Sequence, residues 1–159
     1  MDEKRTANVL TLLGALPFVF LAVLTFTSIA YSIRVDASIV LLMLYAAIIL
    51  SFLGGIRFGM EVRDPADGAN ANLVWSVVPS LVAWFTLLVV YASVMASDMH
   101  MIGWGFAILA LAFVLQFVWD AASTRAGETP RWFGAMRARI TLIVAPTLLI
   151  VAIRAWSIY

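Results

Sequence analysis

The chain has 159 residues, of which 64% are hydrophobic and 12% charged, and its formal net charge is +1. These values exclude a soluble globular domain, because the charged residues are too few to cover its surface. We also expect no nucleic-acid partner. The absence of cysteine excludes disulfides, thiolate metal sites and cysteine nucleophiles.

Five apolar segments follow one another along the chain, and each has about the 20 residues that a helix needs to cross about 30 Å of hydrocarbon. Alternation of the kind found in membrane β-strands is absent. We therefore predict an all-α, polytopic membrane protein, a five-transmembrane-helix bundle folded as one domain over residues 1–159. The predicted helices span residues 8–31, 38–60, 73–95, 101–119 and 140–158.

The second segment carries a small residue at every fourth position: Ala47, Ser51, Gly55 and Gly59. Residues four apart lie on one face of a helix, so these four form a ridge of small side chains. Helix association in lipid depends on close packing, which small residues allow. We predict that this ridge is a close helix contact, either within one chain or between two copies.

Arg57 lies near the end of the same segment, about 160° around the helix from Gly55. Two interpretations remain open. In the first, Arg57 reaches lipid headgroups as an anchor and pairs with Glu61, one turn later on its own face. In the second, Arg57 is buried and pairs with Asp120 beyond the fourth segment, because a buried ionisable group in a membrane protein usually has a partner.

The connection between the third and fourth segments is short, so these two helices should form a tight antiparallel hairpin. The cluster Met95, Met99, His100 and Met101 at this turn offers thioether and imidazole groups, which suit Cu(I). Methionines at a membrane boundary are more often packing residues. We therefore expect neither a metal site nor a cofactor.

Helix breakers and polar side chains recur at one depth in the membrane. The first, third and fifth segments have a proline there, the second has a pair of glycines, and the fourth has an amide and a carboxylate. Backbone groups freed by proline are tolerated when they are buried in protein or line a wet cavity. We predict a vestibule open to the inner face, with ordinary packing of proline-containing helices as the alternative. The candidate lining residues are Arg57, Glu61, Gln116, Asp120, Gly54, Gly55, Pro17, Pro79 and Pro146.

Residues 130–138, before the fifth segment, combine a proline start with aromatic and basic side chains. This combination predicts a short amphipathic helix in the membrane interface, with its aromatic residues toward lipid and its arginines toward phosphate. We expect Arg131, Trp132, Arg137 and Arg139 to bind anionic headgroups on the inner face of the bilayer.

Orientation follows from the basic residues. Of the ten Lys and Arg residues, all except Arg34 and Arg154 fall on the side of the membrane where the chain begins. The positive-inside rule then places the N-terminus inside and the C-terminus outside. We expect a multi-pass protein of the bacterial inner (plasma) membrane, or of the mitochondrial inner membrane in a eukaryote.

Four stretches, taken in order, resemble the motifs of a known family: "YAAIILSFLGGIRFGME", "VVPSLVAW", "LQFVWD" and "RWFGAMRARITL". The family consists of small bacterial and mitochondrial membrane proteins of unknown function and includes animal transmembrane protein 69. Aromatic and then basic residues before the last helix fit its pattern, here Trp132, Phe133, Arg137 and Arg139. The resemblance implies the fold and an inner-membrane location, and it implies no established activity.

No feature of the sequence indicates an enzyme, since it lacks both a nucleophile elbow and a glycine-rich phosphate loop. We expect a binder of a lipid-like or small hydrophobic ligand, or an accessory or assembly subunit of a membrane complex, with a membrane-protein partner or a second copy. A small-solute transporter or channel using the inner vestibule is the alternative, which the almost uniformly apolar outer halves of the segments disfavour. A ligand binder with the five-helix fold of the tryptophan-rich sensory proteins ranks third, because the proline-rich tryptophan motif expected in their first loop is absent.

Overall fold

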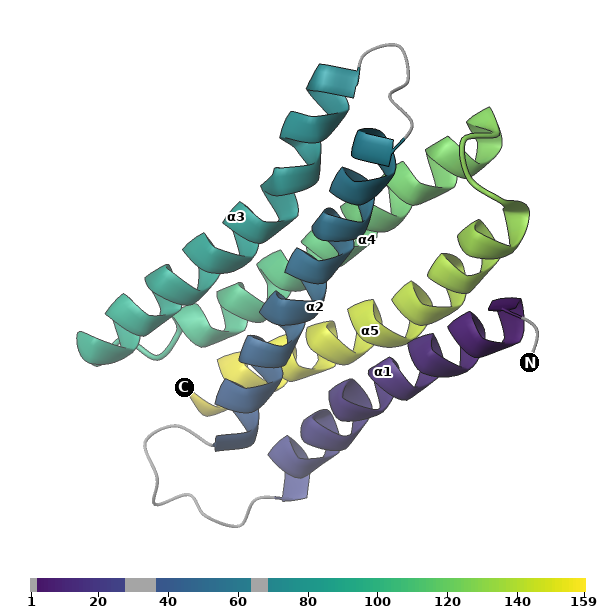
Figure 1. Ribbon diagram of the computed structural model, residues 1–159. Helices are drawn as coiled ribbons and strands as arrows, with labels where there is room; N and C mark the ends of the chain where they lie inside the picture. Colours follow the sequence, from purple (N-terminus) through teal and green to yellow (C-terminus); the bar gives the residue numbers. More distant parts are fainter. Residues whose placement is uncertain (1–2, 28–36, 64–68) are drawn as a thin grey trace.

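The computed structural model describes residues 3–27, 37–63 and 69–159, and within these ranges its regular structure is entirely α-helical (Figure 1). All five helices are long and apolar enough to cross a membrane. The predicted five-helix membrane fold is therefore confirmed, while the orientation of its ends stays a prediction. The helices are α1 (Glu3–Thr27), α2 (Ala37–Arg63), α3 (Ala69–Met95), α4 (Met101–Ala126) and α5 (Arg131–Ile158).

All five helices extend past their predicted spans at the end of the bundle where α1 begins, α2 ends and α4 is connected to α5. We call this the basic end (Figure 1). There α2 continues to Arg63, and α4 continues to Ala126. Gly127 then stops α4 with a φ of 84°, and its N–H donates to the carbonyl of Thr124 at 3.3 Å. Glycine reaches this left-handed conformation without strain, which makes it the common residue at such helix ends.

The separate interfacial helix predicted for residues 130–138 is wrong, because this stretch forms the first turns of α5. Pro130 precedes the helix with extended backbone, and the helix is continuous from Arg131. Gly134 lets α5 approach α4, since a Cβ there would lie 2.8 Å from Thr124 Oγ1. Phe133, expected to face lipid, is buried against the rest of the protein.

The bundle closes as a ring of neighbouring helices. The most extensive packing joins α4 to α5 and α2 to α3, while α1 packs against α2 and α5. α2 also contacts α4, so both helices have buried faces on more than one side. Apolar side chains from all five helices form one core, whose largest fully buried members include Phe18, Leu42, Leu50, Phe106, Leu109 and Leu148.

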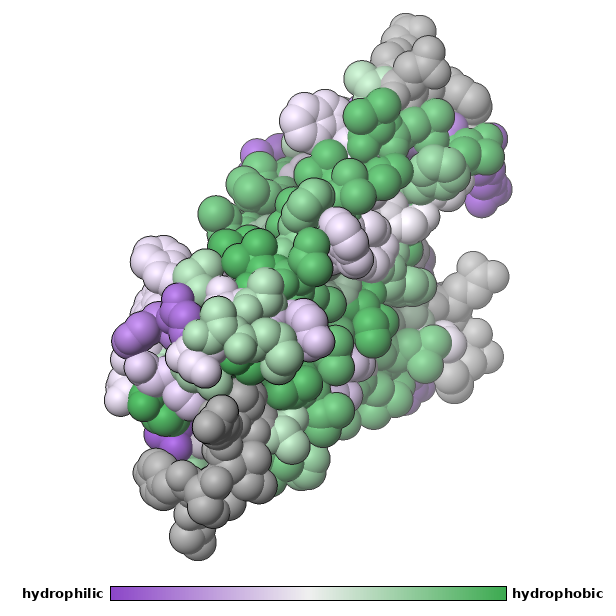
Figure 2. Space-filling view, turned by 90° about the vertical axis from the view of Figure 1, so that its left-hand side faces the viewer, coloured by the Kyte–Doolittle hydropathy of each residue, from purple (hydrophilic) through white to green (hydrophobic). Residues whose placement is uncertain are grey.

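The outer surface of the bundle is apolar over most of its length. Figure 2 shows hydrophobic residues covering most of one face. Large hydrophobic side chains are exposed on every helix, among them Leu10, Phe52, Trp84, Leu111 and Leu142. A surface of this kind is stable in hydrocarbon and aggregates in water. The exposed side chains thus agree with five helices that span a membrane.

The small-residue ridge of α2 is divided: Ala47 is buried in the core, whereas Gly55 and Gly59 make no close contact with the described residues. Gly55 and Gly59 are exposed, and a Cβ at either position would meet no atom within 4 Å. The close approach is made instead by Gly54, where a Cβ would collide with the carbonyl oxygen of Ser76 on α3. The contact face of α2 therefore lies one residue away from the predicted one, and contact of the ridge with a second copy stays a prediction.

Candidate functional site

A buried ion cluster lies toward the basic end and joins three helices. Arg57 Nε on α2 donates to Asp120 Oδ1 on α4 at 2.8 Å, and Arg137 Nε on α5 donates to Asp120 Oδ2 at 2.7 Å. The exposed fractions of Arg57, Asp120 and Arg137 are only 2%, 2% and 4%. One carboxylate therefore serves two guanidinium groups, and the cluster carries a formal excess of one positive charge.

The remaining contacts of Arg57 also come from α4. Arg57 Nη2 donates to Ser123 Oγ at 2.7 Å and to the carbonyl oxygen of Trp119 at 3.1 Å. The guanidinium carbon lies 4.8 Å from the centroid of the Trp119 ring, within the range of a cation–π contact. These contacts use the planar fork of the guanidinium on several sides, which a lysine ammonium could not reproduce.

Of the two partners expected for Arg57, Asp120 is the one with which it pairs in the structure. Glu61 follows Arg57 by one turn, but the described residues include no ion pair between them. Glu61 Oε1 instead accepts a hydrogen bond from Asn72 Nδ2 on α3 at 2.9 Å, and Glu61 Oε2 has no partner among the described residues. The anchor interpretation of Arg57 is therefore wrong, because its guanidinium is buried between helices.

The third member of the cluster, Arg137, was missed by the sequence analysis, which placed it among lipid headgroups. Its burial follows from the early start of α5. Phe133, Arg137, Thr141 and Val144 recur at spacings of four and three residues, and all four are buried. This is the stripe that faces the core in a packed helix, and it becomes visible once the helix is extended back to residue 131. Arg131 and Arg139 are exposed and Trp132 is half-buried, and headgroup binding by these three residues stays a prediction.

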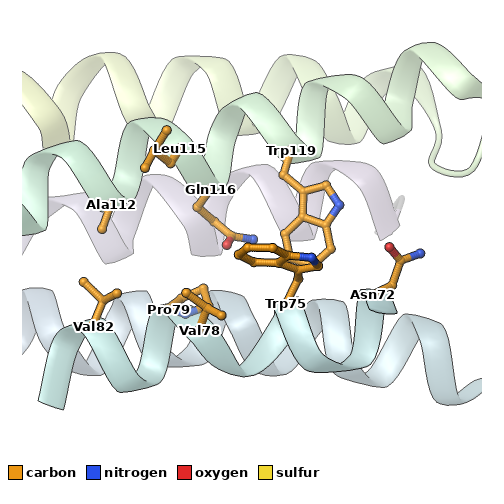
Figure 3. A pocket seen from close by; sticks show the side chains of 9 residues that line it. All are labelled: Asn72, Trp75, Val78, Pro79, Val82, Ala112, Leu115, Gln116 and Trp119. Atoms are coloured by element: carbon orange, nitrogen blue, oxygen red, sulfur yellow. The ribbon is translucent and has the colours of Figure 1, made fainter. Parts of the chain in front are cut away.

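A cleft of about 430 Å³ lies between α3 and α4 (Figure 3). The indole of Trp75 from α3 and that of Trp119 from α4 point toward one another across it, with the amide of Gln116 beside them. Gln116 is only 4% exposed, and its Nε2 has no hydrogen-bond partner among the described residues. The other lining residues are Asn72, Val78, Pro79, Val82, Ala112 and Leu115.

The nine residues predicted to line one vestibule do not share one cavity. Pro79 and Gln116 line the α3–α4 cleft, and Arg57 lies behind its wall in contact with Trp119. Pro146, by contrast, is exposed on the outside of α5, and Pro17 is half-buried in α1. The prolines lie at similar depths in the bundle but face different directions around their helices. The position of a proline in the sequence indicates its depth and does not indicate that direction.

At the turn between α3 and α4, the four suggested copper ligands face different surroundings. Met99 packs against the hydrophobic core, whereas Met95 and His100 are exposed. The backbone N–H of His100 donates to Asp98 Oδ1 at 3.2 Å, a contact that orders the turn. The described residues contain no group of three His, Cys, Asp or Glu side chains that could hold a metal ion.

Comparison with known proteins identifies the family. A family described as "Protein of unknown function (DUF3429)" matches residues 3–153. The chain belongs to this family. Among curated relatives, transmembrane protein 69 of Xenopus tropicalis is 33% identical over 145 residues, which cover 89% of this chain and 51% of the relative. Transmembrane protein 69 of Mus musculus is 29% identical over 156 residues, covering 90% of this chain and 54% of the relative.

This DUF3429 member therefore spans about half the length of the curated relatives it matches. No solved structure matches it. The predicted resemblance is confirmed, and family membership together with five apolar helices makes the chain an integral membrane protein.

Proposed function

We propose that this protein binds a small hydrophobic or lipid-like molecule in the α3–α4 cleft. The observation that carries the proposal is the buried amide of Gln116, whose Nε2 has no partner among the described residues, in a cleft lined mainly by apolar and indole groups. The volume of about 430 Å³ lies in the range typical of small-molecule sites, about 300–1,000 Å³.

The chemistry of the cleft indicates what it would accept. An amide donor with no acceptor costs free energy in a medium without water, and a ligand acceptor such as a carbonyl oxygen would remove that cost. Trp75 and Trp119 offer flat apolar surfaces to the rest of the ligand. We therefore expect an uncharged molecule with one acceptor group and a hydrocarbon part.

Binding is favoured over transport by the distribution of buried polar groups. The ion cluster, Glu61 and Gln116 lie toward the basic end. The buried hydroxyls of Thr25 and Thr86 lie farther from that end, and each donates to a carbonyl of its own helix. Between them lies a core of apolar side chains, so a charged solute would meet no continuous polar path through the described residues.

A photoreactive methyl ketone with a hydrocarbon chain and a terminal diazirine tests the proposal. In detergent solution we expect it to label α3 and α4 saturably, with competition by the unlabelled ketone. Gln116→Leu should remove the saturable labelling without lowering the unfolding temperature, because it replaces an unpaired amide by a group of similar size. Val118→Ala, on the exposed face of α4, is the control and should label like the unmodified protein. Equal saturable labelling of Gln116→Leu would contradict the proposal.

A role as an accessory or assembly subunit is the second candidate, and the exposed Gly55 and Gly59 on α2 favour it. A Cβ added at either position would have no atom within 4 Å, so another helix could approach there closely. Cross-linking after Gly59→Cys in membranes tests this candidate. We expect a cross-linked dimer or heteromer. The control is Phe58→Cys, which is exposed but lies about 100° around the helix from Gly59, and an equally strong cross-link from it would contradict contact through this face.

We also infer that the basic end faces the cytoplasm, or the matrix in a mitochondrion, with the C-terminus on the other side. The inference rests on the distribution of the ten basic residues, of which all except Arg34 and Arg154 fall on the side of the membrane where the chain begins. Fusion of a reporter to the C-terminus tests it. An alkaline phosphatase fusion should be active in a bacterial host, and a green fluorescent protein fusion that is bright instead would contradict the inference.

A further inference from the structure

A second cavity, of about 340 Å³, lies among α1, α2, α4 and α5. Most of its wall is apolar, with contributions from Phe18, Phe52, Phe113 and Val144. Arg137 and Thr141 of α5 interrupt this wall with polar groups. The cavity uses a different face of α4 from the α3–α4 cleft, and the two share no lining residue among those described.

Both polar residues hold a group that has no partner within the described part of the chain. Arg137 uses Nε for Asp120, but its Nη2 is buried and has no hydrogen-bond acceptor there. The hydroxyl of Thr141, one turn later on the same face of α5, is also buried and unpaired. The residues are 4% and 6% exposed. Two adjacent donors thus lack an acceptor, and one of them belongs to a cation.

The charge of the neighbourhood points in the same direction. Arg57 and Arg137 share the single carboxylate of Asp120, which leaves one positive charge without a contacting anion among the described residues. Glu61 is another buried carboxylate near the basic end, but it bonds to Asn72 and forms no ion pair with either arginine of the described cluster. An excess charge in a medium of low dielectric is costly unless an opposite charge approaches it.

We propose that this cavity binds an amphiphile with a single anionic head. An oxygen of its carboxylate or phosphate accepts hydrogen bonds from Arg137 and from the Thr141 hydroxyl, after a small shift of the side chains that cover these donors. The hydrocarbon chain lies along the apolar wall formed by α1, α2 and α4. The volume of about 340 Å³ is at the lower end of the range for small-molecule sites, so it suits one chain next to its head rather than a whole diacyl lipid.

Four ligands with the same oleyl or oleoyl chain test the head: oleate, oleoyl lysophosphatidic acid, oleoyl lysophosphatidylcholine and oleyl alcohol. Their binding to the purified protein in a neutral detergent is followed by native mass spectrometry. We expect oleate or lysophosphatidic acid to bind at least about tenfold more tightly than the alcohol, because hydrogen bonds to charged groups are stronger than those to neutral ones. Binding of oleate alone identifies a free carboxylate as the ligand, and binding of lysophosphatidic acid alone identifies a phosphate head. Equal binding of all four would overturn the proposal.

Two threonine variants of α5 locate the site. Thr141→Val removes the unpaired hydroxyl and should weaken binding of the anionic ligand by about fivefold or more, with no loss of thermal stability in its absence. Thr147→Val is the matched control, because the Thr147 hydroxyl already donates to the carbonyl of Ile143 at 2.7 Å and does not line the cavity. Unchanged affinity in Thr141→Val, or an equal loss in both variants, would overturn the site. Neither outcome depends on Gln116, so this proposal and that for the α3–α4 cleft can fail separately.

Discussion

Arg57 and Arg154 lie toward opposite ends of the bundle and make contacts that are alike in kind. Each donates to a backbone carbonyl oxygen, that of Trp119 for Arg57 and that of Thr25 for Arg154, and each lies over an aromatic ring. The difference is a carboxylate. Arg57 also binds Asp120 and is buried, whereas Arg154 has no ion pair among the described residues and is half-buried. Position near the end of an apolar helix is therefore compatible with either a structural site or a boundary contact, and the partner decides which one is present.

The largest effect should come from removing that carboxylate. Asp120→Asn leaves two buried guanidinium groups without a counter-ion, and breaking a buried pair in this way costs about 3–5 kcal/mol. We expect a loss of this size in the free energy of unfolding, measured by denaturant titration in mixed micelles. Asp98→Asn, at the exposed turn after α3, is the control and should change stability by less than about 0.5 kcal/mol. Equal effects would remove the distinction between a buried cluster and a surface charge.

Removal of Arg57 should have a smaller effect, because Asp120 keeps Arg137 as a partner. Arg57→Gln loses its charged hydrogen bonds and should lower the unfolding free energy by about 1–3 kcal/mol. In a double-mutant cycle with Asp120→Asn, the combined loss should fall short of the sum by about 0.5–3 kcal/mol, as expected for residues in contact. Strictly additive losses would mean that the Arg57–Asp120 pair makes no net contribution.

Adjacent glycines on α2 provide a third comparison. Gly54→Ala would push a methyl group into the Ser76 carbonyl on α3, and overpacking of this kind costs about 1–3 kcal/mol. Gly55→Ala faces open space and should leave stability unchanged or raise it by up to about 1 kcal/mol through better helix propensity. Thermal unfolding of the two variants side by side measures the difference. The opposite order would restore the predicted ridge as the contact face.

Arg154→Gln should have the smallest effect. Its hydrogen bond to the Thr25 carbonyl and its contact with Phe26 are made at a half-buried position, and no carboxylate among the described residues loses a partner. We expect a loss of no more than about 1 kcal/mol in the same denaturant titration. A loss as large as that of Arg57→Gln would show that the aromatic and carbonyl contacts, rather than the carboxylate, dominate both sites.

The sequence was sufficient to predict the five helices, because hydrocarbon thickness fixes how long an apolar segment must be. It was less informative about the residues at which the helices begin or stop at the basic end of the bundle. Charged residues such as Asp120 and Arg137 were interpreted as leaving the membrane, but residues that pair with each other allow α4 and α5 to continue. A hydropathy pattern does not distinguish a charge that meets water from one that meets an opposite charge.

The candidate site was predictable in part for the same reason. Arg57 and Asp120 were expected at one depth on different helices, and a buried charge needs a partner, so Asp120 could be named. Arg137 could not be named while its segment was assigned to the lipid interface. Gly55 and Gly59 mark a face of small residues, but the spacing of residues on one helix does not indicate whether a second helix lies opposite.

The shared carboxylate also constrains how the protein is made. Arg57 precedes Asp120 by 63 residues, so at about 5–20 residues per second it is synthesised roughly 3–13 seconds before its counter-ion. During this interval water or lipid phosphate must solvate the guanidinium, as for any basic residue at a membrane surface. Once α4 supplies the carboxylate we expect Arg57 to enter the bundle, and Arg137, 17 residues later in the chain, binds the second oxygen. We therefore expect Arg57 to lie at the membrane surface until α4 has been synthesised and to join the helices afterwards.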